Sequence, residues 1–229
     1  MDSKSWKFFI VATISTILVL LVLTLYKIYN VEQKVFNTNK FVFELLTDKR
    51  VSEISTVDID DIVIGDTLAP VTMVVYTKYK CPYCDEFFKK TFPHIKKKYV
   101  DNGILKMVIR YLVSPNNEAG YLVAKSSYYS YRNGIFEEFN SYLLNPNFDN
   151  LSSESLNDYF INRNVSEDFK DFIGRSEVNL IIKRKTIEAG DAGIARTPTF
   201  IVNEQVFVGD KKNKFDEIIV NALNRSSCL

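Results

Sequence analysis

The sequence predicts an α/β domain that is interrupted by a layer of helices and preceded by one membrane-spanning helix. Three observations predict it: an uncharged segment near the N-terminus, strand-like apolar runs on both sides of a region without them, and a Cys-Pro-Tyr-Cys motif. The 229-residue chain carries 29 basic and 28 acidic side chains. Its length suffices for one substantial core, and the near-neutral balance gives no indication of nucleic-acid binding.

The N-terminal segment over residues 8–26 contains no charged side chain. As a helix rising about 1.5 Å per residue it spans roughly 28 Å, close to the hydrocarbon thickness of a bilayer. Lys4 and Lys7 precede it, which favours a cytoplasmic N-terminus. A cleaved signal peptide has a shorter apolar region and a small-residue cleavage site, and residues 23–26 do not provide one. Residues 1–29 are therefore predicted to be a cytoplasmic stub and an uncleaved transmembrane anchor.

Residues 30–60 mix charged and apolar positions and are predicted to form a partly helical stalk. It can serve as a spacer between membrane and domain, or as a short oligomerisation helix. The sequence leaves both alternatives open.

The α/β domain is expected over residues 61–225. Strands are predicted at residues 62–64, 71–77 and 105–113, with a helix at 82–100. The second and third runs are predominantly apolar and do not alternate with polar residues, which indicates strands buried on both faces.

A helical insert is expected over about residues 115–190, where strand-like runs are missing. Its helices are predicted over residues 118–131, 136–144, 154–162, 167–172 and 177–189. Strands follow at 199–202 and 205–208, joined by a two-residue turn. An amphipathic helix over 215–223 closes the domain before a tail at 226–229.

The motif Cys81-Pro82-Tyr83-Cys84 lies between the strand at 71–77 and the helix that follows. A cysteine at a helix N-terminus faces free backbone N–H groups and the positive end of the helix dipole, which favour its thiolate. Cys81 is therefore the predicted nucleophile. Pro82 fits the first helical turn because it has no N–H to leave unpaired. Cys84, one turn later, can attack a mixed disulfide and release the substrate.

The stretches at 64–72, 81–84 and 197–202 together resemble the DsbA-like thiol-disulfide oxidoreductases of the thioredoxin superfamily. The resemblance covers about residues 61–225. The 114 positions between residues 84 and 198 suit this branch, because thioredoxins and glutaredoxins have far less chain there. The resemblance implies a thioredoxin fold that is interrupted by a helical domain and acts outside the cytoplasm on cysteines of other proteins. Together with the predicted anchor, it makes the chain a membrane-anchored member of the family.

The resemblance also implies the substrate site. A cis peptide bond is expected before Pro198, beside the cysteine pair, leaving the Thr197 backbone to pair with an extended substrate. Pro82 and Tyr83 are expected to contact substrate as well. Val75 occupies a position where many relatives carry a buried acid. Strongly oxidising relatives often have histidine where this chain has Tyr83, so a milder oxidant is expected.

The predicted function is to form or exchange disulfides in reduced or misoxidised secreted and envelope proteins. The two sulfurs carry both electrons, so no cofactor is expected, but an oxidase needs a membrane redox partner that recycles the pair. The alternatives are a disulfide reductase or isomerase, and a redox-inactive chaperone that only binds peptides.

Other chemistries find little support in the sequence. A zinc site could draw on Cys81, Cys84, Cys228 and His94, but His94 lies about 15 Å along the helix from Cys84. His94 also lacks a neighbouring nucleophile for hydrolysis. Cys228 is expected to be an idle tail thiol. Two further sets of side chains are expected to be structural rather than catalytic. Lys78 and Lys80 are expected to lie on a solvated rim. Core packing is expected for the tyrosines of the first insert helix, Tyr121, Tyr128, Tyr129 and Tyr131.

Overall fold

The computed structural model describes residues 3–145, 151–165, 168–211 and 214–226. It divides into two compact units, the first ending at Asp48. That unit belongs to helix α1 (Ser3–Ser55), which from Thr13 onward is long and apolar enough to cross a membrane. The helix continues through most of the segment expected to be only partly helical. The described apolar side chains between Ile14 and Leu25 are exposed, as a surface facing lipid requires.

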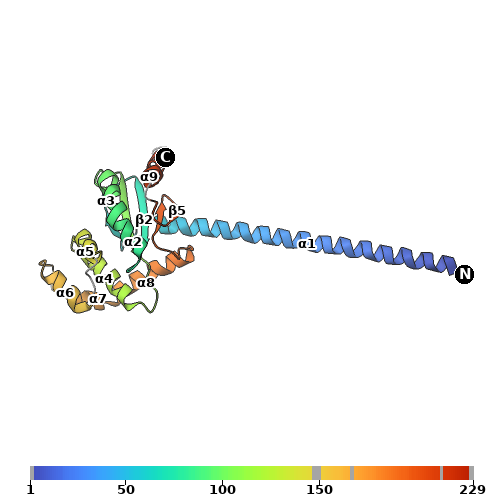
Figure 1. The fold of residues 1–229 in the computed structure, drawn as a ribbon, viewed down its shortest axis with the longest axis horizontal. Coiled ribbons are helices and arrows are strands. Elements are labelled where there is room, and N and C mark those ends of the chain that lie inside the picture. Colours follow the sequence, from blue (N-terminus) through green and yellow to red (C-terminus); the bar gives the residue numbers. More distant parts are fainter. Residues whose placement is uncertain (1–2, 146–150, 166–167, 212–213, 227–229) are drawn as a thin grey trace. The chain divides into compact units, whose positions relative to one another are not determined.

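The second unit begins at Lys49 and is built on a five-stranded sheet (Figure 1). Its strands are β1 (Ile62–Ile64), β2 (Val71–Thr77), β3 (Leu105–Tyr111), β4 (Thr199–Val202) and β5 (Gln205–Val208). They lie in the order β1-β3-β2-β4-β5. β2 and β3 are parallel, and the other neighbouring pairs are antiparallel. This is the predicted α/β architecture.

Strand β2 lies at the centre and is buried on both faces. Met73 and Val75 face one apolar core, and Val74 and Tyr76 face a second core on the opposite side. All four side chains are fully buried. The prediction from the continuous apolar run is confirmed, because a strand with two covered faces has no solvent-facing position for a polar residue.

The first core lies under a helical run that connects β2 to β3. The run comprises α2 (Pro82–Glu86), η1 (Phe87–Thr91), α3 (Phe92–Ile95) and η2 (Lys96–Val100), of which η1 and η2 are π-helical. The wider turn of η1 precedes Pro93, which has no N–H to donate and whose ring crowds the preceding turn.

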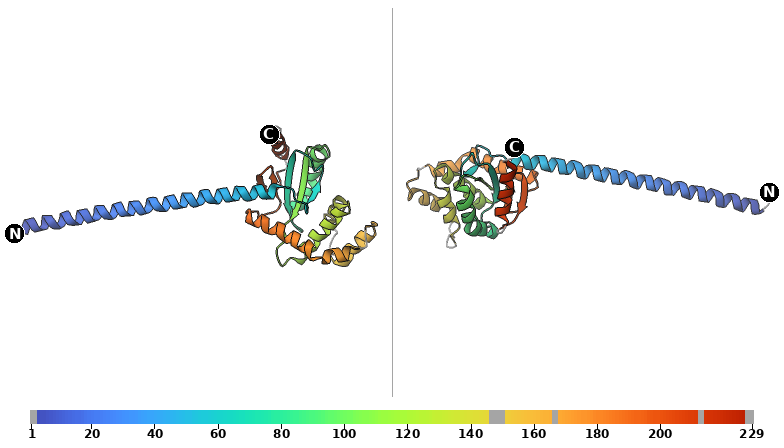
Figure 2. Two further views of the ribbon diagram at one scale, coloured as in Figure 1. Left: turned by 180° about the vertical axis from the view of Figure 1, so that it is seen from behind. Right: turned by 90° about the horizontal axis from the view of Figure 1, so that it is seen from above.

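Helix α9 (Phe215–Ser226) packs on this same core, and Phe87 contacts the rings of Phe200 and Phe215 there. The helical insert extends the core away from the sheet (Figures 1 and 2). Its helices are α4 (Glu118–Arg132), α5 (Phe136–Leu143), α6 (Ser153–Ile161), α7 (Phe169–Gly174) and α8 (Ser176–Asp191).

The tyrosines of α4 pack as predicted. Tyr129 is buried and contacts the rings of Phe160, Phe169 and Phe172. Tyr128 is also buried, and the other two predicted tyrosines are partly buried against the same core. They therefore belong to the interior of the insert.

The second core, on the opposite face of the sheet, is covered by the end of α1 and the end of α8. Val51 and Ile54 from α1 are buried there beside Ala189 and Ile194. The packed unit therefore includes residues 49–60, which the sequence analysis placed in the stalk.

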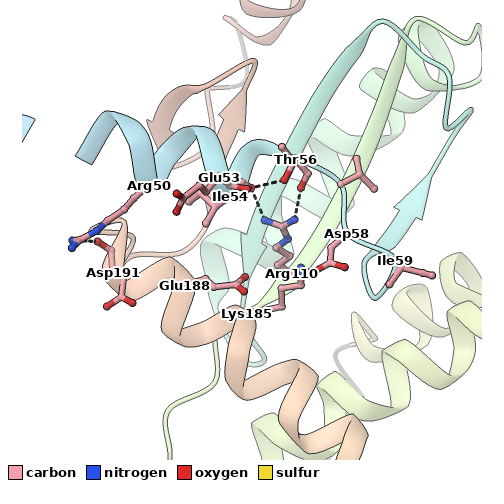
Figure 3. Close-up of a pocket in the computed structure, with 11 residues that line it drawn as sticks. Arg50, Glu53, Ile54, Thr56, Asp58, Ile59, Arg110, Lys185, Glu188 and Asp191 are labelled. Carbon is pink, nitrogen blue, oxygen red and sulfur yellow. Dashed lines mark hydrogen bonds and ion pairs between the residues drawn. The ribbon is translucent and has the colours of Figure 1, made fainter. Parts of the chain in front are cut away.

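A buried arginine holds the last turn of α1 against the sheet (Figure 3). Arg110 on β3 donates to the backbone carbonyls of Ile54 and Thr56, the second at 2.7 Å. It also forms a bidentate ion pair with Asp61, in which Nε and Nη2 of Arg110 donate to the two carboxylate oxygens at 2.8 and 2.6 Å. The Nζ atom of Lys185 lies 3.2 Å from the same carboxylate. Arg110 thus satisfies helix-end carbonyls that have no partner within the helix.

Replacing this arginine should destabilise the domain strongly. Arg110→Met leaves the Asp61 carboxylate buried with only Lys185 as a described cation partner, so the free energy of unfolding should fall by about 3–5 kcal/mol. Urea titration of the full chain in a non-ionic detergent, followed by near-UV circular dichroism, measures it. Lys90→Met, which breaks the exposed pair with Glu86, should cost less than about 1 kcal/mol. Equal small losses in both variants would contradict the role of Arg110.

Candidate functional site

Cys81 lies where the chain leaves β2 and enters the helical run. It is the N-terminal cap of α2, with extended backbone, and Pro82 occupies the first turn as predicted. The N–H groups of Cys84 and Asp85 donate to the Cys81 carbonyl at 2.9 and 3.0 Å. Lys80 has a φ of 55°, a left-handed conformation that turns the chain just before the cysteine.

Thr197 lies against the sulfur of Cys81. The Cys81 thiol donates to the Thr197 carbonyl at 3.5 Å, and the Thr197 hydroxyl donates to the Cys81 sulfur at 3.4 Å. The Thr197–Pro198 peptide bond is cis, which confirms the expectation for Pro198. Among the described residues the Thr197 N–H has no backbone acceptor. The predicted backbone site therefore lies directly beside the predicted nucleophile.

Cys84 is more deeply enclosed than Cys81, with 1% of its surface exposed. Burial raises the pKa of the Cys84 thiol to about 11, and a hydrogen bond with Cys81 acts in the same direction. Hydrogen bonds with Thr77 and with the backbone of Lys78 oppose the shift without cancelling it. Near neutral pH the reduced pair therefore keeps its second sulfur protonated.

Thr77 and Tyr111 are site residues that the sequence analysis missed. Thr77 lies on the same face of β2 as Val75 and is the strand residue that hydrogen-bonds with Cys84. Tyr111 pairs in register with Thr77, and burial raises the pKa of Tyr111 to about 12. Its hydroxyl accepts from Ser127 at 2.9 Å. Their place at the ends of the two strands nearest the motif is the signal that could have identified them.

A groove of about 850 Å³ lies over Cys81. The groove brings together all four predicted substrate-contact residues: Pro82, Tyr83, Thr197 and Pro198. Pro82 and Tyr83 are exposed at its edge, whereas Pro198 is buried. An extended peptide can therefore reach the Cys81 sulfur and the Thr197 backbone in the same groove.

His94 takes no part in this site. His94 lies 3.1 Å from Asp216 on α9, at the surface of the helical run. Cys228 lies outside the described residues. Within the part of the chain that the structure describes, no group of three or more His, Cys, Asp or Glu side chains is arranged to hold a metal ion.

Comparison with known sequences identifies the fold family. A family model described as thioredoxin matches residues 57–221. A candidate protein-disulfide oxidoreductase of Rickettsia typhi is 23% identical over 159 residues, which cover 66% of this chain and 56% of that protein. The chain thus spans about half the length of the curated Rickettsia relatives that it matches over this region.

Solved structures show the same architecture. Oxidised BdbD of Bacillus subtilis aligns with a TM-score of 0.63 and 24% identity, covering 72% of this chain and 94% of that one. Wolbachia pipientis alpha-DsbA1 aligns with a TM-score of 0.66 and 23% identity, covering 78% and 98%. The fold is accordingly DsbA-like, a thioredoxin fold that contains a helical insert.

The two thiols should differ sharply in reactivity. With a pKa of about 11, Cys84 at pH 7.5 has roughly 300-fold less thiolate than a cysteine of ordinary pKa near 8.5. Timed iodoacetamide labelling of the reduced protein, mapped by mass spectrometry, should therefore modify Cys81 first. Labelling of Cys84 should accelerate about tenfold per pH unit until about pH 11. Faster modification of Cys84 near neutral pH would reverse the assignment.

Proposed function

The chain belongs to the thioredoxin family, and from that premise we propose that it is a DsbA-like thiol-disulfide oxidoreductase. It forms or exchanges disulfide bonds in other proteins through Cys81 and Cys84. The observation that carries this proposal is the contact of the Cys81 sulfur, at the start of a helical run, with the hydroxyl and carbonyl of Thr197.

The reaction begins when a substrate thiolate attacks the Cys81 sulfur of the oxidised pair. A bond forms between substrate and Cys81, the Cys81–Cys84 bond breaks, and its electron pair goes to Cys84. Because burial raises the pKa of Cys84, the leaving sulfur takes up a proton near neutral pH. The second substrate thiolate then attacks the substrate sulfur of the mixed disulfide and displaces Cys81. The substrate is oxidised by two electrons, which remain on the cysteine pair.

Substrate binding is assigned to the groove. The backbone of Thr197 pairs with an extended substrate strand, as in strand addition to a sheet edge. Pro198 supports that segment from the interior, and Pro82 and Tyr83 contact the substrate from the start of α2. Backbone pairing accepts many sequences, which suits an enzyme that acts on different proteins.

We further propose that the chain is a single-pass protein of the cell membrane, with its N-terminus cytoplasmic and its catalytic unit outside the cytoplasm. Support comes from the length and apolar composition of α1. There it acts on secreted or envelope proteins, and a membrane redox partner reoxidises the pair. Protease added to intact spheroplasts should remove the catalytic unit while the remainder of α1 stays in the membrane. Full protection of the unit would contradict this topology.

Substitution of the two cysteines separates attack from resolution. In a Cys228→Ser background, Cys81→Ser should abolish disulfide exchange, because the attacked sulfur is missing. Cys84→Ser should instead accumulate mixed disulfides with substrate, because the resolving sulfur is missing. Each protein, in its reduced form, is incubated with a substrate that contains a disulfide, and non-reducing electrophoresis distinguishes the two. In the Cys84→Ser protein the Cys81 thiolate attacks that disulfide and stays bonded to one substrate sulfur, while the other substrate sulfur leaves as a thiol. Exchange by the Cys81→Ser protein at the wild-type rate would overturn the proposed function.

A further inference from the structure

The groove over Cys81 carries charge of only one sign. Its charged lining residues are Lys78, Lys80 and Arg196, and none of the described residues that line it is acidic. The chain as a whole has a formal net charge of +1, so the excess of positive charge is local to the groove. The two lysines lie in the loop between β2 and Cys81, and Arg196 immediately precedes Thr197.

These three cations are available to a ligand. All three side chains are exposed, and none forms an ion pair with a described residue. The nearby acid Asp85 interacts electrostatically with Lys89, and burial raises the Asp85 pKa. The cations of the groove are therefore not already neutralised by the protein.

The pocket at the end of α1 shows the opposite arrangement (Figure 3). It has a volume of about 410 Å³ and contains both signs of charge. There Arg110 binds Asp61, and Lys185 binds Asp58 at 3.0 Å. Because those cations are already paired, that pocket holds the domain together, whereas the groove retains unused positive charge.

The position of Arg196 sets the distance at which an acid would be recognised. Thr197 contacts the reacting sulfur, and Arg196 is the preceding residue of the same bend, its Cα about 3.8 Å away. A peptide paired with Thr197 therefore presents the neighbours of its cysteine to Arg196. The lining also contains apolar side chains, among them Leu112, Pro115 and Ile194. The groove thus combines apolar contact with positive charge.

We propose that the groove selects extended peptide segments in which Asp or Glu lies within two residues of the reacting cysteine. The acid is recognised by Lys78, Lys80 and Arg196 through charge complementarity, which mainly raises the rate of productive encounter. This preference rests on the proposed function, since it requires that Cys81 react with the peptide. It specifies a class of substrate sequence that backbone pairing alone does not.

The test measures mixed-disulfide formation by the full-length Cys84→Ser, Cys228→Ser protein in a non-ionic detergent. The probes are two short peptides that differ only in Glu or Gln beside a cysteine activated as its 2-thiopyridyl disulfide. The Cys81 thiolate attacks the peptide sulfur, and the S–S bond breaks to release pyridine-2-thione, read at its absorbance. Rates are divided by those of 2-mercaptoethanol with the same peptides, which removes differences in intrinsic reactivity.

At low salt the Glu peptide should react roughly fivefold to twentyfold faster than the Gln peptide, and the ratio should fall toward one at about 1 M salt. The ratio should also fall toward one when Lys78, Lys80 and Arg196 are all replaced by Gln. A wild-type ratio near one, or a ratio that survives this triple replacement, would overturn the preference.

A matched control keeps the net charge of the triple variant. Lys97, Lys170 and Lys183 are exposed and lie outside the groove lining, and replacing all three by Gln should preserve the preference for the Glu peptide. Loss of the preference in this control would show a general charge effect and would also overturn the proposal. If neither peptide forms a mixed disulfide with Cys81, the proposed function itself fails, which distinguishes the two outcomes.

Discussion

The pairing of β2 on both of its edges is the constraint on which the site depends. β2 is hydrogen-bonded to β3 on one side and to β4 on the other, and apolar cores cover both of its faces. The carboxyl end of β2 is therefore held in position by hydrogen bonds on both edges and by packing on both faces. The short loop after Thr77 delivers Cys81 to the start of the helical run, while β4 begins just after Pro198. Residues 116 positions apart thus meet at the Cys81–Thr197 contact.

The two cysteines share a motif but not an environment. Cys81 opens onto the groove, whereas Cys84 is enclosed beneath it and hydrogen-bonded with Thr77 at the end of β2. Burial of Cys84 raises the pKa of its thiol. In the proposed mechanism this enclosure confines the resolving attack of Cys84 to a mixed disulfide already held on Cys81. The proposed exchange and the proposed release of substrate would then both use the same short helical turn.

Much of this arrangement could be predicted from the sequence, because its signals are local. Continuous apolar runs identified the buried strands, and the motif placed Cys81 at a helix start. Residues whose role depends on distant partners gave no such signal. Arg110 looks like an interruption of an apolar run until Asp61 and the end of α1 are brought to it.

The boundary of the packed unit shows the same limit. Val51 and Ile54 have helical spacing in a mostly polar segment, which suits a stalk equally well. Without this helix end the apolar face of β2 that carries Val74 and Tyr76 would lack part of its cover, and this requirement determines that the helix end packs into the domain. Val75 shows the same limit on a smaller scale. The residue of β2 that hydrogen-bonds with Cys84 is Thr77, two positions further along the strand.

The most direct test of the account is the reduction potential of the Cys81–Cys84 pair in the full chain, measured by equilibration with glutathione or dithiothreitol buffers and quantified by thiol trapping. A catalytic pair with Tyr83 between its cysteines should show one two-electron transition between about −270 and −120 mV, the range from thioredoxin to DsbA. The Cys81→Ser protein should lose that transition. A potential below about −300 mV, typical of structural disulfides, or no transition at all, would contradict a role in disulfide exchange.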